Sequence, residues 1–156
     1  HADMIVFCPG SLQTGIISAL LTRGIQTAIR VSRAIKVQVC NIMTHPGQTD
    51  DFSARDHLQT LAEHLGSAPD VFIVNSKRPP AAWLRVYRKE GSMPVRLDVQ
   101  GMRGIRVLSR NLLEPAGTDV LTLYTRGGGY ARQGLHFIRH DPEKLGRLLR
   151  DIVKSC

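Results

Sequence analysis

The sequence predicts an α/β domain over residues 1–156, with a mainly parallel sheet covered by helices on both faces. Three observations predict this class. Short apolar runs alternate with amphipathic runs of helical period. Turn formers and helix caps stand at the junctions, as in Pro9-Gly10-Ser11. No linker or internal repeat divides the chain. In such sheets, ligands bind beyond the carboxyl ends of the strands.

The individual elements follow from periodicity and from the residues that start and stop helices. Ser53 is the expected N-cap of one helix, with Asp56 in the position of a capping-box acid and Gly66 as its stop. Asp141 is the expected N-cap of the last helix, with Pro142 at its first position. In chain order, the expected elements are a strand at 4–8, helices at 11–22 and 24–31, a strand at 34–40, a loop at 44–51, a helix at 53–65, a strand at 71–75, a helix at 79–90, strands at 95–99 and 105–109, a weaker strand at 119–124, a glycine-rich loop at 126–133 and a helix at 141–153.

Composition narrows the class of partners. The chain carries a net charge of +8, but its basic residues are scattered and no nucleic-acid-binding motif is present, so nucleic acid is not an expected partner. No apolar run is long enough to cross a bilayer, and no membrane partner is expected. The three cysteines form no CxxC pair, and Cys8 and Cys40 each end an apolar run. Both are expected to be buried and reduced, which indicates a cytoplasmic protein.

The turn after the first strand is the leading candidate for a phosphate site. A helix N-terminus presents unpaired N–H groups and partial positive charge. Gly10 would let the backbone approach a phosphate, and Ser11 and Thr14 would add hydroxyl donors. The alternative is an ordinary capped turn. The turn matches neither the Walker A, the GxGxxG nor the GxSxG pattern, so Ser11 is not an expected nucleophile and no catalytic residue is assigned.

Further polar residues follow the second and third strands. Asn41 and Thr44 begin a loop that ends at Asp50, and Asn75 closes the third strand. Asp50 could hold a divalent cation such as Mg²⁺ through its carboxylate oxygens. The alternative is a turn whose polar side chains bond only to their own backbone.

Two residues in the C-terminal part are candidates for contacts with a nucleotide. Trp83 and Tyr87 share one face of a helix; Trp83 is expected in the core, whereas Tyr87 has a polar end that could contact a base or sugar. Arg139 could donate two hydrogen bonds to a phosphate, or form a salt bridge to a carboxylate. The neighbouring His140 could titrate near neutral pH.

Several of these stretches, in this order, resemble the gluconeogenesis-factor family, the bacterial relatives of 2-phospho-L-lactate transferase. Residues 2–14 are similar to the family's AD-x-I-V-x-GPGSLYTS, and residues 39–50 to its VCNVMTQPGETD. Residues 53–57 resemble its TASDHV, and residues 138–142, Ile-Arg-His-Asp-Pro, also match. Cys8 stands where the family has the first glycine of GPGS, and residues 112–133 form a longer stretch than the family pattern.

The resemblance implies a C-terminal half of the family's domain, and hence an incomplete Rossmann-like three-layer sandwich that a partner copy could complete as a homo-oligomer. It implies a regulator that binds a nucleotide diphosphate or a UDP-sugar, such as UDP-N-acetylglucosamine, and influences carbon metabolism and cell shape. The family's GPGS loop falls on Pro9, Gly10 and Ser11, and the tyrosine and arginine of its nucleotide-sugar site fall on Tyr87 and Arg139. With the polar residues found above, the expected phosphate contacts are Gly10, Ser11 and Thr14, and the expected nucleotide-sugar contacts are Asn41, Thr44, Asn75, Tyr87 and Arg139. The alternative is a transferase that moves a phospholactyl-type group to an alcohol with Mg²⁺ held at Asp50.

Overall fold

The computed structural model describes residues 2–115 and 137–155. Its centre is a sheet of four parallel strands in the order β1-β2-β3-β4, so the predicted parallel α/β class is confirmed. In register, Val6 lies beside Val37, Val37 beside Val71, and Ile73 beside Leu108. The strands are β1 (Met4–Phe7), β2 (Ile35–Val39), β3 (Val71–Asn75) and β4 (Arg106–Arg110).

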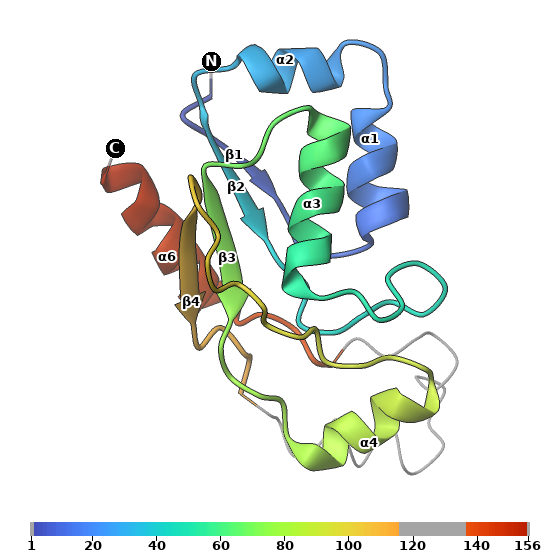
Figure 1. Cartoon of the computed structure of the whole chain (residues 1–156). Helices are drawn as coiled ribbons and strands as arrows, with labels where there is room; N and C mark the ends of the chain where they lie inside the picture. The colour runs from blue at the N-terminus through green and yellow to red at the C-terminus, as the bar shows by residue number, and fades with distance from the viewer. Residues whose placement is uncertain (1, 116–136, 156) are drawn as a thin grey trace.

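One face of the sheet is covered by the helices that connect the first three strands (Figure 1). Leu61 and Leu65, both fully buried, pack with Phe7, and Leu58 packs with Phe72 in a second cluster. Because each crossover returns to the next parallel strand with the same hand, these helices share one side. They are η1 (Leu12–Ile17), a π-helical turn continued by α1 (Ser18–Leu20), then α2 (Ile25–Val31) and α3 (Ala54–Leu65).

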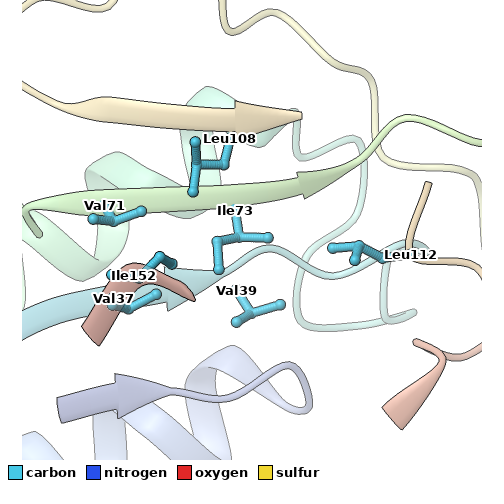
Figure 2. Packing of buried hydrophobic residues seen from close by; sticks show 7 residues of the cluster. All are labelled: Val37, Val39, Val71, Ile73, Leu108, Leu112 and Ile152. Carbon is cyan, nitrogen blue, oxygen red and sulfur yellow. The ribbon is translucent and has the colours of Figure 1, made fainter. Parts of the chain in front are cut away.

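The opposite face is covered by α6 (Pro142–Lys154). Figure 2 shows Ile152 from this helix lying against side chains of β2 and β3. The strand residues alternate between the two faces, and those facing α6 are almost entirely apolar. The cluster consists of Val37, Val39, Val71, Ile73, Leu108, Leu112 and Ile152. Helices on both sides of one sheet give the predicted three layers.

Helix α4 (Ala81–Lys89) lies apart from these layers, beyond the carboxyl ends of the strands (Figure 1). Its apolar side forms a separate core in which Trp83 and Tyr87 are 5% and 3% exposed. The expected shared face of these two residues is therefore confirmed. The rest of that core comes from loops that leave the sheet, at Ile42, Met43, Leu113 and Ile138.

Some local predictions were wrong. Residues 95–99 do not form a strand: the segment crosses the start of α3 and makes single backbone contacts, from Val95 N to Ile42 O at 3.0 Å and from Ala54 N to Arg96 O at 2.8 Å. Val95 is buried, but Leu97 is 42% exposed and Val99 is half-buried, so the alternating pattern does not mark the buried face of a strand. Cys8 is exposed, since β1 ends at Phe7; Cys40 is buried, and burial raises the pKa of its thiol to about 12. The expectations at 119–124 and 126–133 lie outside the described residues.

None of the helices in the described part of the chain has the length and apolar character that crossing a bilayer requires.

His140 lies just before α6, where two loop segments pair briefly with each other. It forms an isolated bridge with Leu113, and its Nε2 atom is buried without a hydrogen-bond partner among the described residues. Burial disfavours the charged imidazole and lowers the pKa of His140 to about 4, below the neutral range expected from the sequence.

This burial predicts a loss of stability in mild acid. The pKa of His140 is about 4 in the folded chain against 6.5 as the ordinary value, so the unfolded chain takes up the proton first as the pH falls. The contribution of neutral His140 to the free energy of unfolding should be fully present above pH 6.5 and should decline as the pH falls toward 4. Urea unfolding of the parent and of His140→Gln at a series of pH values measures this. The variant should lose less stability over that window; parallel curves would contradict the assignment.

Candidate functional site

Two loops at the carboxyl edge of the sheet are hydrogen-bonded to each other. The Gly10 N–H donates to Asn41 Oδ1 at 2.9 Å, and Asn41 Nδ2 donates back to Gly10 O at 2.7 Å. One residue along, the Ser11 hydroxyl donates to Gln48 Oε1 at 2.5 Å. Gly10 has a φ of +155°, a backbone conformation that side chains rarely adopt. These bonds fix the turn after β1 against the loop after β2.

Ser11 caps the helix that begins at this turn. Its Oγ accepts the Thr14 N–H at 3.1 Å and lies 2.6 Å from Thr14 Oγ1, so the two hydroxyls and Gln48 form one network. Among the described residues, the backbone N–H groups of Leu12 and Gln13 have no acceptor. The turn therefore has the composition of an anion site, namely free amides beside hydroxyl groups.

The N-termini of α3 and α6 are, by contrast, already capped by groups of the chain itself, carboxylates among them. Ser53 and Asp56 form the predicted capping box of α3, and hydrogen bonds from Ser53 hold the pKa of Asp56 below its usual range. Asp98 accepts the Arg55 N–H at 2.9 Å. At α6, the predicted N-cap Asp141 accepts two backbone N–H groups, each at 3.0 Å. Neither helix start has room for an external anion of the same kind.

A second group of predicted residues surrounds the segment that leads into α6. Asn75 Oδ1 accepts the Leu112 N–H at 3.0 Å. The Tyr87 hydroxyl accepts the Ile138 N–H at 2.9 Å, and the ring packs edge-on against Phe137. Burial raises the pKa of Tyr87. The phenol is therefore a support for residue 138 and, in this conformation, is not an exposed surface for stacking.

Arg139 is the exposed member of this second group. Its guanidinium forms an ion pair with Glu114 through Nε and Nη2, and the backbone N–H of Glu114 donates to Arg139 O at 3.0 Å. The arginine side chain remains 69% exposed, so it is accessible to a ligand. The salt bridge that the sequence suggested as an alternative is therefore present, and the guanidinium is still accessible to a ligand.

Thr44 and Asp50 serve the loop after β2. Thr44 is buried, and its Oγ1 accepts the Met93 N–H at 2.9 Å. Asp50 is exposed, and its Oδ2 accepts the Gly47 N–H at 2.8 Å. In the described part of the chain, no three His, Cys, Asp or Glu residues are close enough together to hold a metal ion. Asp50 alone fits Mg²⁺ only as one ligand beside phosphate oxygens from a bound nucleotide.

Sequence reasoning did not single out Gln48 or Glu114, although each bonds directly to a predicted residue. Gln48 lies within the stretch 39–50 that carries the family resemblance, which could have drawn attention to it. Nothing in the sequence pairs Glu114 with Arg139, because 24 residues separate them.

The comparisons with known proteins agree with this architecture. The family model described as 2-phospho-L-lactate transferase CofD matches residues 1–113. A putative gluconeogenesis factor from Thermotoga maritima is 36% identical over 99% of this chain and 45% of its own length. The gluconeogenesis factor of Bacillus subtilis is 34% identical over 99% of this chain and 44% of its own length.

The fold also matches a solved structure. A crystal structure of a UPF0052 family member from Bacillus halodurans superposes with a TM-score of 0.76 at 31% identity, over 94% of this chain and 42% of that one. The chain thus spans less than half the length of these relatives. The motifs at both ends of the chain, the family-model match and the parallel sheet place it in the CofD family, among the gluconeogenesis factors.

Proposed function

We propose that this chain supplies part of a binding site for the diphosphate of a nucleotide or UDP-sugar, in a cytoplasmic regulator of carbon metabolism and cell shape. One observation carries the proposal: the amides of Leu12 and Gln13 have no acceptor among the described residues, whereas the starts of α3 and α6 are closed by carboxylates. A phosphate would satisfy these amides and the adjoining hydroxyls of Ser11 and Thr14.

The other predicted residues have distinct roles in this proposal. Asn41 keeps Gly10 in the conformation that lets backbone approach the ligand. Arg139 neutralises charge on the diphosphate or on the group beyond it. Asn75, Tyr87 and Thr44 act on the nucleotide-sugar side by holding the loops that frame it. The net charge of +8 favours an anionic ligand as a whole.

A second candidate is a transferase, and the observation that favours it is the match to the 2-phospho-L-lactate transferase model. In that case Mg²⁺, held at Asp50 and by the nucleotide, would polarise the diphosphate. Incubation of a UDP-sugar or a phospholactyl nucleotide with an acceptor alcohol, followed by mass spectrometry, distinguishes the two. Turnover that requires Mg²⁺ and is lost in Asp50→Asn supports the enzyme; binding without turnover supports the regulator.

Substitution of Ser11 by aspartate separates folding from binding. Aspartate is as good an N-cap as serine, so η1 should keep its cap. A carboxylate cannot donate to Gln48 Oε1 as the hydroxyl does, but Gln48 can turn its amide so that Nε2 donates instead, and the free energy of unfolding should change by about 1 kcal/mol. The new carboxylate would occupy the unpaired amides and repel a phosphate. Calorimetry should therefore show loss of UDP binding, while urea unfolding stays close to the parent. A variant that still binds UDP at the parent's affinity would remove this turn from the site.

Substitution of Arg139 by alanine tests the charge contact. We expect the affinity for UDP-N-acetylglucosamine to fall by about 2 kcal/mol, the contribution of one charge-assisted hydrogen-bonded pair. Arg147→Ala is the matched control, because Arg147 is also an exposed arginine paired with a glutamate, within α6. Isothermal titration calorimetry of both variants measures the difference. Equal affinities in the two variants would count against a role for Arg139.

A further inference from the structure

Glu114 and Arg139 are held opposite each other by their backbones. Residues 112–114 pair with residues 139–141 in a short antiparallel ribbon, in which Glu114 N donates to Arg139 O at 3.0 Å and Asp141 N donates to Leu112 O at 2.7 Å. The central residues, Leu113 and His140, form the bridge between the two segments. The two charged side chains are therefore placed as neighbours before any ion pair forms.

The side-chain contact between them uses only part of the guanidinium. Arg139 Nε donates to Glu114 Oε2, and Nη2 donates to Oε1 at 3.2 Å. A guanidinium has five N–H donors in a rigid plane. Glu114 takes one donor from Nε and one from Nη2, so the edge between Nη1 and Nη2 has a second pair of parallel donors, which no other described residue accepts. A phosphate requires such a pair for a forked contact.

We propose that Glu114 is a positioning residue of the ligand site: its carboxylate holds the Arg139 guanidinium by one edge and leaves the other edge for the ligand's phosphate. This inference rests on the proposed function. It assigns a role to a residue that the family motifs do not contain, and it makes Arg139 one part of a two-residue unit.

Two opposing effects of Glu114 can be weighed. Its negative charge lowers the attraction of the arginine for an anion, but both side chains contact solvent, which screens that term. A free arginine would have to give up many rotamers on binding, whereas a guanidinium already held by a carboxylate on one edge loses fewer. The ribbon adds rigidity, because Leu112 is fixed by Asn75 and residue 138 by Tyr87. Positioning therefore outweighs repulsion.

The test is a double-mutant cycle with UDP and inorganic pyrophosphate as probes, measured by calorimetry. Glu114→Ala should weaken binding about fivefold, a fraction of one charge-assisted contact. The same substitution in an Arg139→Ala background should cause no further loss, because Glu114 acts only through the arginine. Glu143→Ala is the control, since it removes the same charge and an exposed partner of Arg147. Tighter binding in Glu114→Ala, or an equal loss in both backgrounds, would overturn the inference.

A readout that needs no ligand distinguishes this inference from the proposed function. Exchange of the Arg139 Nε proton with water, followed by NMR and assigned through Arg139→Lys, should be slowed in the parent and become fast in Glu114→Ala. It should stay slow in Glu143→Ala. Slow exchange with no binding of UDP or pyrophosphate would refute the proposed site while leaving the ion pair intact. Fast exchange in the parent would refute the positioning role itself.

Discussion

The reciprocal hydrogen bonds between Gly10 and Asn41 are the constraint on which the carboxyl edge of the sheet depends. They join the turn after β1 to the loop after β2. The pairing of the strands alone does not determine how these two loops are placed relative to each other. Once Gly10 is fixed, Ser11 can cap η1 and reach Gln48 at the same time. The result is a helix start that is rigid on one side and, within the described residues, open at its amides on the other.

This open start contrasts with the starts of α3 and α6, whose first backbone N–H groups are accepted within the chain, whereas α2 and α4 begin without a side-chain cap. An unpaired amide in a buried or half-buried place has a cost, and a carboxylate N-cap such as Asp141 at the start of α6 removes it by accepting two backbone N–H groups. Ser11 provides a neutral cap instead. A neutral cap beside free amides retains the positive end of the helix dipole for something outside the chain.

The sequence was sufficient for the sheet, its helices and the caps at Ser53 and Asp141, because these depend on local periodicity and on single capping residues. It failed at 95–99, where apolar residues alternate as in a strand although Leu97 is exposed and the backbone makes isolated contacts instead of a ladder. It identified the polar residues of both groups, yet not their connections: the bond from Tyr87 to residue 138 and the pairing of Arg139 with Glu114 depend on long-range packing beyond the sheet. Such contacts have no local signature.

The position of α4 explains how Tyr87 comes to lie beside the segment that carries Arg139. Because α4 packs against loops and not against the sheet, its position depends on Ile42 from the connection after β2 and on Ile138 from the segment before α6. The Tyr87 hydroxyl bonds to the backbone of Ile138, next to Arg139, whose guanidinium is exposed to solvent. The short ribbon that carries Arg139 is therefore tied to α4 through the bond between Ile138 and Tyr87, and to the end of β3 through the bond between Leu112 and Asn75. Arg139 owes its position to these two backbone attachments, because its own side chain bonds to Glu114 of the same ribbon.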